Sequence, residues 1–199
     1  PPTVMADNAT GIIRDGKSGE ILVGTYGIGV VAIDPEKGDS RLYAPAAQAP
    51  DYAQILLVNA MESDERGRVW IGTETGGVYR YNPGLPWEKA FSNFNMRSGL
   101  ENNNILSVCS DGAGKLWLLS GSGIFAIDTS GRFRYRLSAD ESFGFTAYGS
   151  DARYPHPVYF NSTDQELLVA VGGGLLRYPV SGHQQRLRFP LVLTGIRAD

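Results

Sequence analysis

Short apolar runs bounded by glycine and aspartate recur along the chain, and the clearest of them covers residues 67–81. Val69–Thr73 is apolar and rich in β-branched side chains, and Val78–Tyr81 alternates aromatic with other residues, so both segments are predicted to be strands. Gly76-Gly77 between them offers the positive φ angles that a tight hairpin needs. A turn at 64–67 separates this hairpin from the apolar run 55–58, which we expect to be a third, inner strand.

The same strand–turn–strand pattern appears four times, which is the most informative feature of the sequence. The other copies lie at 19–34, 111–128 and 165–179. Aligning Gly24, Gly72, Leu119 and Ala170 gives spacings of 48, 47 and 51 residues. Further aromatic segments end three of the units, at 41–43, 91–94 and 133–135. Four strands in roughly 40–50 residues are typical of a β-propeller blade, so the sequence predicts an all-β fold of about four antiparallel, four-stranded blades.

The repeat also predicts how the chain is divided. We expect blades near 1–50, 51–97, 98–137 and 138–188. Residues 138–157 break the rhythm and form an insertion within the last of these units. Because rings usually close with more blades, and because an unclosed arc leaves strand edges free to pair, we expect a partial ring from a larger propeller. Two copies pairing through exposed blade edges, as a homodimer, is one way to cover such edges.

Particular motifs resemble a known family. Two segments resemble the two-component-regulator propeller repeat. One runs from Ser98-Gly99-Leu100 through Asn103-Asn104-Ile105 to Trp117, and the other is Asp64–Thr73. Such repeats fill the periplasmic sensor region of Bacteroidetes-type hybrid two-component histidine kinases. Residues 189–199 resemble the first strand of the immunoglobulin-like domain that follows the propeller there. The sequence departs from the pattern at Leu119-Ser120, where Gly-Thr is expected, and lacks the tryptophan in the first and fourth copies.

Composition and charge argue against several kinds of binding partner. The chain of 199 residues has a formal net charge of −3 and no basic stripe, which argues against nucleic-acid binding. No apolar run approaches the length that crosses a bilayer, so we expect no membrane contact within this segment. Its two histidines, His156 and His183, are not at metal-ligand spacing, and no glycine-rich phosphate loop opens a helix. The sequence therefore predicts no metal and no cofactor.

Conspicuous side chains are better explained by packing than by catalysis. Trp70 and Trp117 are expected to fill the gaps between neighbouring blades. Cys109 lies on an apolar inner strand and is predicted to be a buried, inert thiol. Asp64 and Asp111 begin turns, where they are expected to bond their own backbone. No residues form a catalytic constellation, so the fragment is predicted not to be an enzyme.

Ligand binding is the better candidate activity. Sugars are held by flat aromatic faces together with planar hydrogen-bonding groups, and propeller loops can present both on a rigid scaffold. A turn at 82–87 carries a tryptophan that is expected to be exposed, and the insertion adds further polar and aromatic residues. The alternative is that the insertion is only a longer connection packed against the propeller. The candidate ligand-binding residues are Trp87, Tyr148, Asp151, Arg153, Tyr154 and His156.

The resemblance implies a function that the residues alone do not. It implies an extracytoplasmic, periplasmic sensor fragment of an inner-membrane histidine kinase, responding to oligosaccharides and not itself catalytic. Two alternatives stay open. A propeller can serve as a protein-interaction scaffold, or less readily as an enzyme acting on polysaccharides, which needs paired acids or a histidine cluster.

Overall fold

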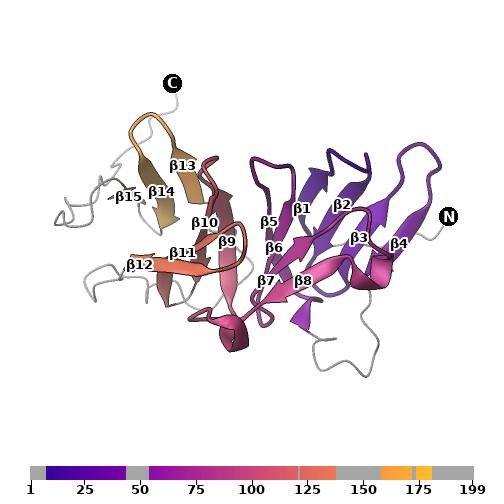
Figure 1. The fold of residues 1–199 in the computed structure, drawn as a ribbon, viewed down its shortest axis with the longest axis horizontal. Coiled ribbons are helices and arrows are strands. Elements are labelled where there is room, and N and C mark those ends of the chain that lie inside the picture. The colour runs from indigo at the N-terminus through magenta and orange to yellow at the C-terminus, as the bar shows by residue number, and fades with distance from the viewer. Residues whose placement is uncertain (1–7, 44–53, 121, 138–157, 172–173, 181–199) are drawn as a thin grey trace.

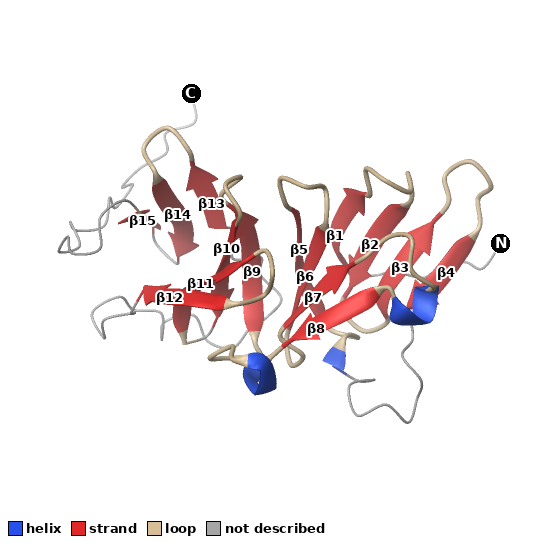
Figure 2. Cartoon of the chain, viewed as in Figure 1, coloured by secondary structure: helices blue, strands red, loops and turns tan. Residues whose placement is uncertain are grey.

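The computed structural model describes residues 8–43, 54–120, 122–137, 158–171 and 174–180, which form four β-sheets. Every sheet is antiparallel, and its strands neighbour one another in chain order. The sheets follow one another along an arc (Figure 1), and helix is limited to short 3-10 turns in the described residues (Figure 2). This architecture confirms the predicted all-β fold of antiparallel propeller blades.

The strands have the following bounds. Sheet 1 contains β1 (Ala9–Arg14), β2 (Ile21–Thr25), β3 (Gly29–Ile33) and β4 (Ser40–Tyr43). Sheet 2 contains β5 (Val58–Ser63), β6 (Val69–Thr73), β7 (Val78–Tyr81) and β8 (Phe91–Phe94). Sheet 3 contains β9 (Ile105–Ser110), β10 (Lys115–Ser120), β11 (Gly123–Asp128) and β12 (Phe133–Leu137). Sheet 4, as far as it is described, contains β13 (Val158–Asn161), β14 (Glu166–Val171) and β15 (Gly174–Pro179). Two 3-10 turns, η2 (Trp87–Lys89) and η3 (Met96–Ser98), flank β8.

The predicted hairpin β6–β7 has the expected bounds, but the expected inner strand at 55–58 is wrong, because β5 begins only at Val58. Of the residues before it, Leu56 and Leu57 contact the turn between β2 and β3 of sheet 1, and the Leu57 carbonyl also accepts from the amide of Glu74, directly after β6. Leu57 forms an isolated bridge with Tyr26, and the carbonyl of Leu56 accepts hydrogen bonds from the turn between β2 and β3. Of the two turn glycines, only Gly77 has a positive φ, of 80°. The apolar run thus links two blades rather than extending one.

Neighbouring sheets lie face to face: β5 lies against β1 and β2, β9 lies against β5 and β6, and β13 lies against β9. This approach is so close that the second strand carries glycine at the contact. A Cβ on Gly24 would lie 2.7 Å from Val58 Cγ1, and one on Gly72 would lie 2.8 Å from Ile105 Cγ2. The aligned glycines of the repeat are therefore required by contact between blades.

Sheet 3 departs from this arrangement at Leu119, where the sequence has no glycine at the aligned position of the repeat. Leu119 replaces the glycine and is 2% exposed, in an apolar cluster with Phe160 of β13. The leucine side chain therefore lies between β10 and the next inner strand, β13. Ser120 replaces the following threonine and makes the equivalent hydrogen bond. Its Oγ donates to the carbonyl of Gly123 at 3.0 Å, as Thr73 Oγ1 donates to the carbonyl of Gly77 at 2.9 Å.

Three apolar clusters fill the spaces between successive sheets. Trp70 is fully buried between sheets 2 and 3, among residues that include Ile105 and Phe125. Trp117 is fully buried between sheets 3 and 4, with Leu167 among its neighbours. The prediction that both tryptophans pack between blades is confirmed. Burying such a side chain contributes on the order of 2–3 kcal/mol.

One buried carboxylate fixes the indole of Trp70. Asp64 Oδ2 accepts from Trp70 Nε1 at 2.8 Å and from Arg68 Nε at 2.7 Å. Its Oδ1 accepts from the backbone amides of Arg66 and Arg68 at 2.9 and 3.0 Å. Asp111 Oδ1 likewise accepts from the amides of Ala113 and Lys115. These contacts confirm that both aspartates bond their own turns, and Asp64 additionally links its turn to the core.

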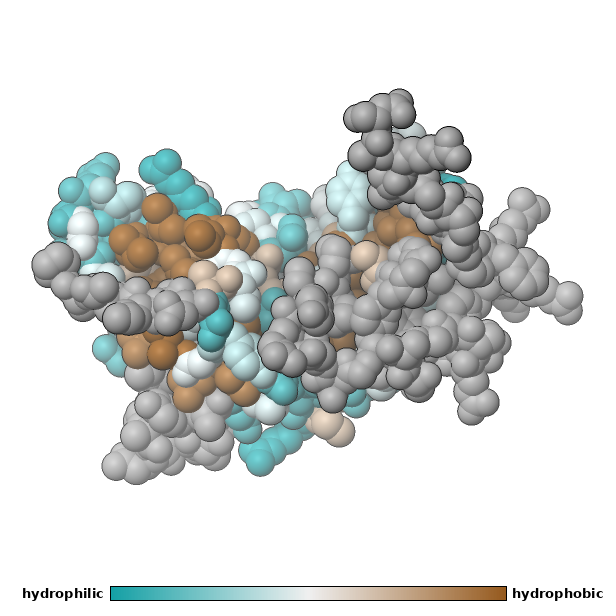
Figure 3. Space-filling model, turned by 180° about the vertical axis from the view of Figure 1, so that it is seen from behind, coloured by the Kyte–Doolittle hydropathy of each residue, from teal (hydrophilic) through white to brown (hydrophobic). Residues whose placement is uncertain are grey.

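The free face of sheet 1 is apolar. Ile12 and Leu42, which lie at the two ends of a cross-strand row through Val23 and Val31, are 67% and 45% exposed. Seen from behind, apolar surface gathers at the end of the molecule where sheet 1 lies (Figure 3). In sheets 2 and 3 the corresponding face packs against the preceding sheet. The pairing of two copies through exposed blade edges stays a prediction.

Adding one methyl group at Gly72 tests the close approach of blades. We expect Gly72→Ala to lower the free energy of unfolding by about 1–3 kcal/mol, because the β-branched Ile105 and Val108 cannot swing aside. Chemical denaturation measures the effect. Gly16→Ala is the matched control, since no atom lies within 4 Å of its added Cβ, and equal effects in the two variants would contradict the packing described.

Removing the charge of Asp64 tests the carboxylate. Burial raises the pKa of Asp64, but the bonds from Trp70, the backbone and Arg68 outweigh it, so the pKa lies below its usual value. Its contribution to stability is therefore present above about pH 4, the unfolded pKa, and lost as pH falls through the lower folded pKa. We expect Asp64→Asn to cost about 1.5–3 kcal/mol near pH 7 and progressively less below pH 4 in denaturation series. The exposed Asp39→Asn serves as control, and a cost for Asp64→Asn that does not change with pH would refute the assignment.

Candidate functional site

Of the six predicted ligand-binding residues, the structure places one. Trp87 begins η2, in the connection between β7 and β8, directly after Pro86, whose φ of −50° suits the entry to the turn. Its side chain is partly buried, so the expectation that it is exposed is wrong. Tyr148, Asp151, Arg153, Tyr154 and His156 lie outside the described residues.

Trp87 joins sheet 2 to sheet 1. Its Nε1 donates to the carbonyl of Leu42 on β4 at 2.9 Å. Its ring meets three aromatic rings edge to face, those of Tyr43, Phe91 and Tyr81, at centroid distances of 5.7, 5.3 and 6.1 Å. Such pairs contribute about 0.5–1.5 kcal/mol beyond the burial of their area. The indole therefore holds the outer parts of two blades together.

An arginine covers the indole of Trp87. The guanidinium carbon of Arg41 lies 4.6 Å from the ring centroid, and its Nη2 contacts Glu20 Oε1 at 2.5 Å. Glu20 Oε2 in turn accepts from the hydroxyl of Tyr81 at 3.1 Å. Burial, with the nearby Glu20 carboxylate, raises the pKa of Tyr81 to about 12, so this hydroxyl stays protonated and donates. A ligand reaching this face of Trp87 has to displace Arg41.

A polar hollow of about 290 Å³ adjoins this junction. Asp34 and Lys37 form an ion pair within it at 3.1 Å. Charged donors and acceptors of both signs on one surface suit a ligand rich in hydroxyl groups, which can donate and accept at once. The hollow is lined by Glu20, Ala32, Asp34, Lys37, Asp39, Ser40 and Arg41.

Sequence reasoning missed this hollow for an understandable reason. Glu20 and Arg41 stand at opposite ends of the first unit, and Trp87 belongs to the second. The pairing of β2, β3 and β4 brings Glu20 and Arg41 together within sheet 1, and the stacking of sheet 1 on sheet 2 adds Trp87. The repeat alone does not give these distances. The turn at 34–39 nevertheless carries acidic and basic residues in the sequence, which was a usable signal.

The described residues offer little for catalysis or metal binding. They include no group of three or more histidine, cysteine, aspartate or glutamate residues placed to hold a metal ion. Burial, followed by the nearby Glu62, raises the pKa of Cys109 to about 12, so its thiol is protonated at neutral pH. The prediction that Cys109 is buried is confirmed, and a protonated thiol is a poor nucleophile. None of the helices in the described ranges is long and apolar enough to span a bilayer.

Several solved structures have a similar fold. The extracellular domain of the hybrid two component system BT3049 from B. thetaiotaomicron gives a TM-score of 0.66 at 13% identity, over 91% of this chain and 24% of that one. The extracellular domain of the hybrid two component system BT4673 from B. thetaiotaomicron gives 0.63 at 19%, over 87% of this chain and 23% of that one. A catalytically inactive virginiamycin B lyase from Staphylococcus aureus, with quinupristin, gives 0.63 at 13%, over 96% and 58%.

The chain has the fold of part of a β-propeller. Its likeness to the two Bacteroides domains agrees with the resemblance to sensor propellers found in the sequence, and it spans about a quarter of their length. At these identities the likeness concerns fold alone. The chain matches no family model and no curated protein.

The buried thiol gives a probe of the junction between sheets 3 and 4. We expect iodoacetamide at pH 8 to modify Cys109 at least 100-fold more slowly in the native chain than in the denatured chain, because burial suppresses both access and the thiolate. Mass spectrometry follows the reaction, and the denatured chain is the internal control. Native and denatured rates within a few-fold of each other would show that this junction opens freely.

Proposed function

We propose that the chain is part of the ligand-sensing, periplasmic region of a hybrid two-component histidine kinase anchored in the inner membrane. The observation that carries this proposal is the combination of the Asp64–Thr73 and Leu100–Trp117 motifs with a fold shared with two Bacteroides extracellular domains of such systems. Each line of support is independent, since one rests on residues and the other on backbone geometry. The kinase itself lies elsewhere in the parent protein under this proposal.

An oligosaccharide is the ligand that we propose for it. Support comes from the mixed-charge hollow beside Trp87, and from the aromatic and planar polar residues predicted in the insertion. A sugar needs bidentate, planar hydrogen-bonding partners and an aromatic face, and these residue types supply both. Under this proposal the chain binds without turnover.

The lyase neighbour favours a second candidate function. Its similar fold shows that blades of this kind also occur in an enzyme, so catalysis is the alternative to sensing. Such an activity needs an acid–base pair facing the ligand. Scaffolding of a protein partner is a third class, and it predicts indifference to sugars.

Signalling adds a requirement that binding alone does not meet. A sensor has to occupy two states with different affinities for ligand. We propose that the joint at Trp87 is where such states differ, because a ligand that displaces Arg41 from the indole removes a contact between sheet 1 and sheet 2. The orientation of sheet 1 on sheet 2 then depends on the ligand.

A panel of immobilised oligosaccharides tests the proposed ligand class. We expect saturable binding to one group of saccharides without release of shorter products. Lys37→Gln should weaken it about tenfold or more if the hollow is the site, and Tyr154→Ala should do so if the insertion is the site, since each removes a principal contact. Arg97→Gln, exposed on η3, is the control.

The outcomes separate the three classes. Cleavage of any saccharide by the chain would establish an enzyme instead of a sensor. Absence of saccharide binding at millimolar concentration, with capture of a defined protein partner, would favour the scaffold and contradict the sensing proposal.

A further inference from the structure

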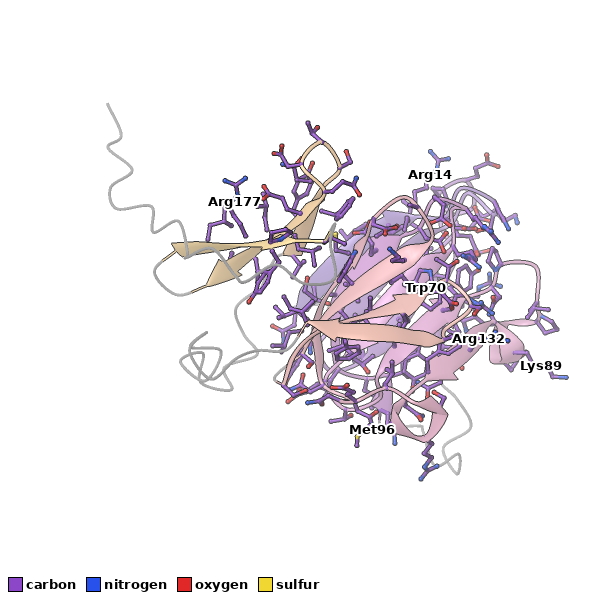
Figure 4. All side chains as sticks on the ribbon, turned by 60° about the vertical axis from the view of Figure 1, so that its left-hand side comes forward. Arg14, Trp70, Lys89, Met96, Arg132 and Arg177 are labelled. Carbon is purple, nitrogen blue, oxygen red and sulfur yellow. The ribbon has the colours of Figure 1, made fainter. Side chains whose placement is uncertain are left out.

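Two arginines meet at the buried tryptophan of sheet 2. Arg68 precedes β6, and Arg80 lies on β7 directly opposite Trp70 in the sheet register. Their guanidinium carbons are 5.9 and 5.7 Å from the centroid of the Trp70 ring, and Arg80 also lies 5.6 Å from the ring of Phe94. Trp70 itself lies inside the stack of sheets in Figure 4. Two cations thus share one aromatic surface at the junction of sheets 2 and 3.

Among the described residues, one carboxylate pairs with these two charges. Asp64 pairs with Arg68 at 2.7 Å, whereas Arg80 is held by neutral acceptors, Asn82 Oδ1 at 3.0 Å and the carbonyl of Thr129 at 3.4 Å. Burial lowers the pKa of Arg80, the positive charge of Arg68 lowers it further, and Asp64 opposes both. Glu62, opposite Trp70 on β5, forms no ion pair with either arginine in the described part of the chain, and burial raises its pKa.

One hydrogen-bond donor in this group lacks an acceptor among the described residues. Arg68 Nη2 is buried and makes no hydrogen bond, although the Arg68 side chain as a whole keeps 17% of its surface exposed. Leaving a charged donor buried without an acceptor costs free energy, commonly more than 1–3 kcal/mol. An acceptor carrying negative charge would relieve both this cost and the repulsion between the two guanidinium groups.

We propose that this junction binds an oxyanion group, either a carboxylate, a sulfate or a phosphate, between Arg68 and Arg80. Planar guanidinium groups bond such anions through paired N–H donors. The turn of sheet 3 whose Thr129 carbonyl accepts from Arg80 also carries the exposed Arg132, whose backbone amide donates to Asp128 Oδ1 (Figure 4). The site is independent of the hollow beside Trp87, and it stands whether or not the chain senses sugars.

The comparison with Trp87 shows why the arginines at Trp70 are distinctive. Arg41 also covers an indole, but its charge is matched by Glu20 at 2.5 Å. One cation there meets one carboxylate, whereas at Trp70 two cations meet one. The chain therefore contains its own reference site, with the same kinds of side chain and no unbalanced charge.

Indole resonances read out the proposed site directly. The chain has three tryptophans, so its nitrogen–proton correlation spectrum contains three indole signals, and Trp70→Phe identifies that of Trp70. Titration with sodium sulfate, sodium phosphate or sodium acetate at constant ionic strength should shift the Trp70 signal saturably, because its indole N–H bonds the carboxylate that also holds Arg68. The signals of Trp87 and Trp117 should stay in place. Response to acetate alone would assign a carboxylate, and response to sulfate and phosphate alone a tetrahedral oxyanion.

Two variants and a control complete the test. Arg80→Gln should weaken the anion-dependent shift of Trp70 at least tenfold, and Arg132→Gln, at an exposed position that leaves the core intact, should weaken it severalfold. Arg97→Gln should leave it unchanged. Equal shifts of all three indoles, no shift of Trp70 with any of the three anions, or an undiminished shift in both Arg80→Gln and Arg132→Gln would overturn the proposal.

Discussion

Contact between the inner strand of one sheet and the inner and second strands of the sheet before it is the constraint on which this structure depends. An isolated sheet of four short strands has two faces to cover and little core of its own. Stacking solves this, but only if the backbones approach closely, which is why Gly24 and Gly72 are glycine. This contact sets the distance between neighbouring sheets. The tryptophans pack between the sheets at that distance, and Asp64 bonds the indole of Trp70 there.

The arc is not uniform along its length. Sheets 1 and 2 are tied at both their inner strands and their outer turns, the latter through Trp87, Arg41 and Glu20. Between sheets 3 and 4, Leu119 stands where the earlier contacts have glycine, and Phe160 packs against it. Binding at the outer joint and charge imbalance at Trp70 concern different junctions, so a ligand at either one would act on a different pair of blades.

The blades could be predicted because the regular spacing of the strands is visible in a single sequence. The turns of Asp64 and Asp111 could be predicted because these side chains bond their own backbone. The start of β5 could not be predicted, since 55–57 are apolar in either role and Leu56 and Leu57 contact the neighbouring sheet. The setting of Trp87 could not be predicted for the same reason, because its hydrogen-bond acceptor, the carbonyl of Leu42, lies 45 residues away. The unbalanced arginines at Trp70 required the register of β6 on β7, which places Arg80 beside the indole. Of the contacts between blades, the packing of Trp70 and Trp117 could be predicted from the residue type, whereas the polar contacts across the junctions could not.

Disulfide trapping across sheets 1 and 2 is the most direct test of face-to-face stacking. A Cβ on Gly11 would lie 3.1 Å from Met61 Cβ, near the separation of about 3.5–4.5 Å found in disulfides, whereas Ile12 points to the opposite, exposed face of β1. Mild oxidation of Gly11→Cys/Met61→Cys should therefore yield a monomer with an internal disulfide, detected by mass and by electrophoretic mobility without reductant. Ile12→Cys/Met61→Cys should stay reduced. Efficient bridging in the second pair, or none in the first, would contradict the stacking of blades on which this account rests.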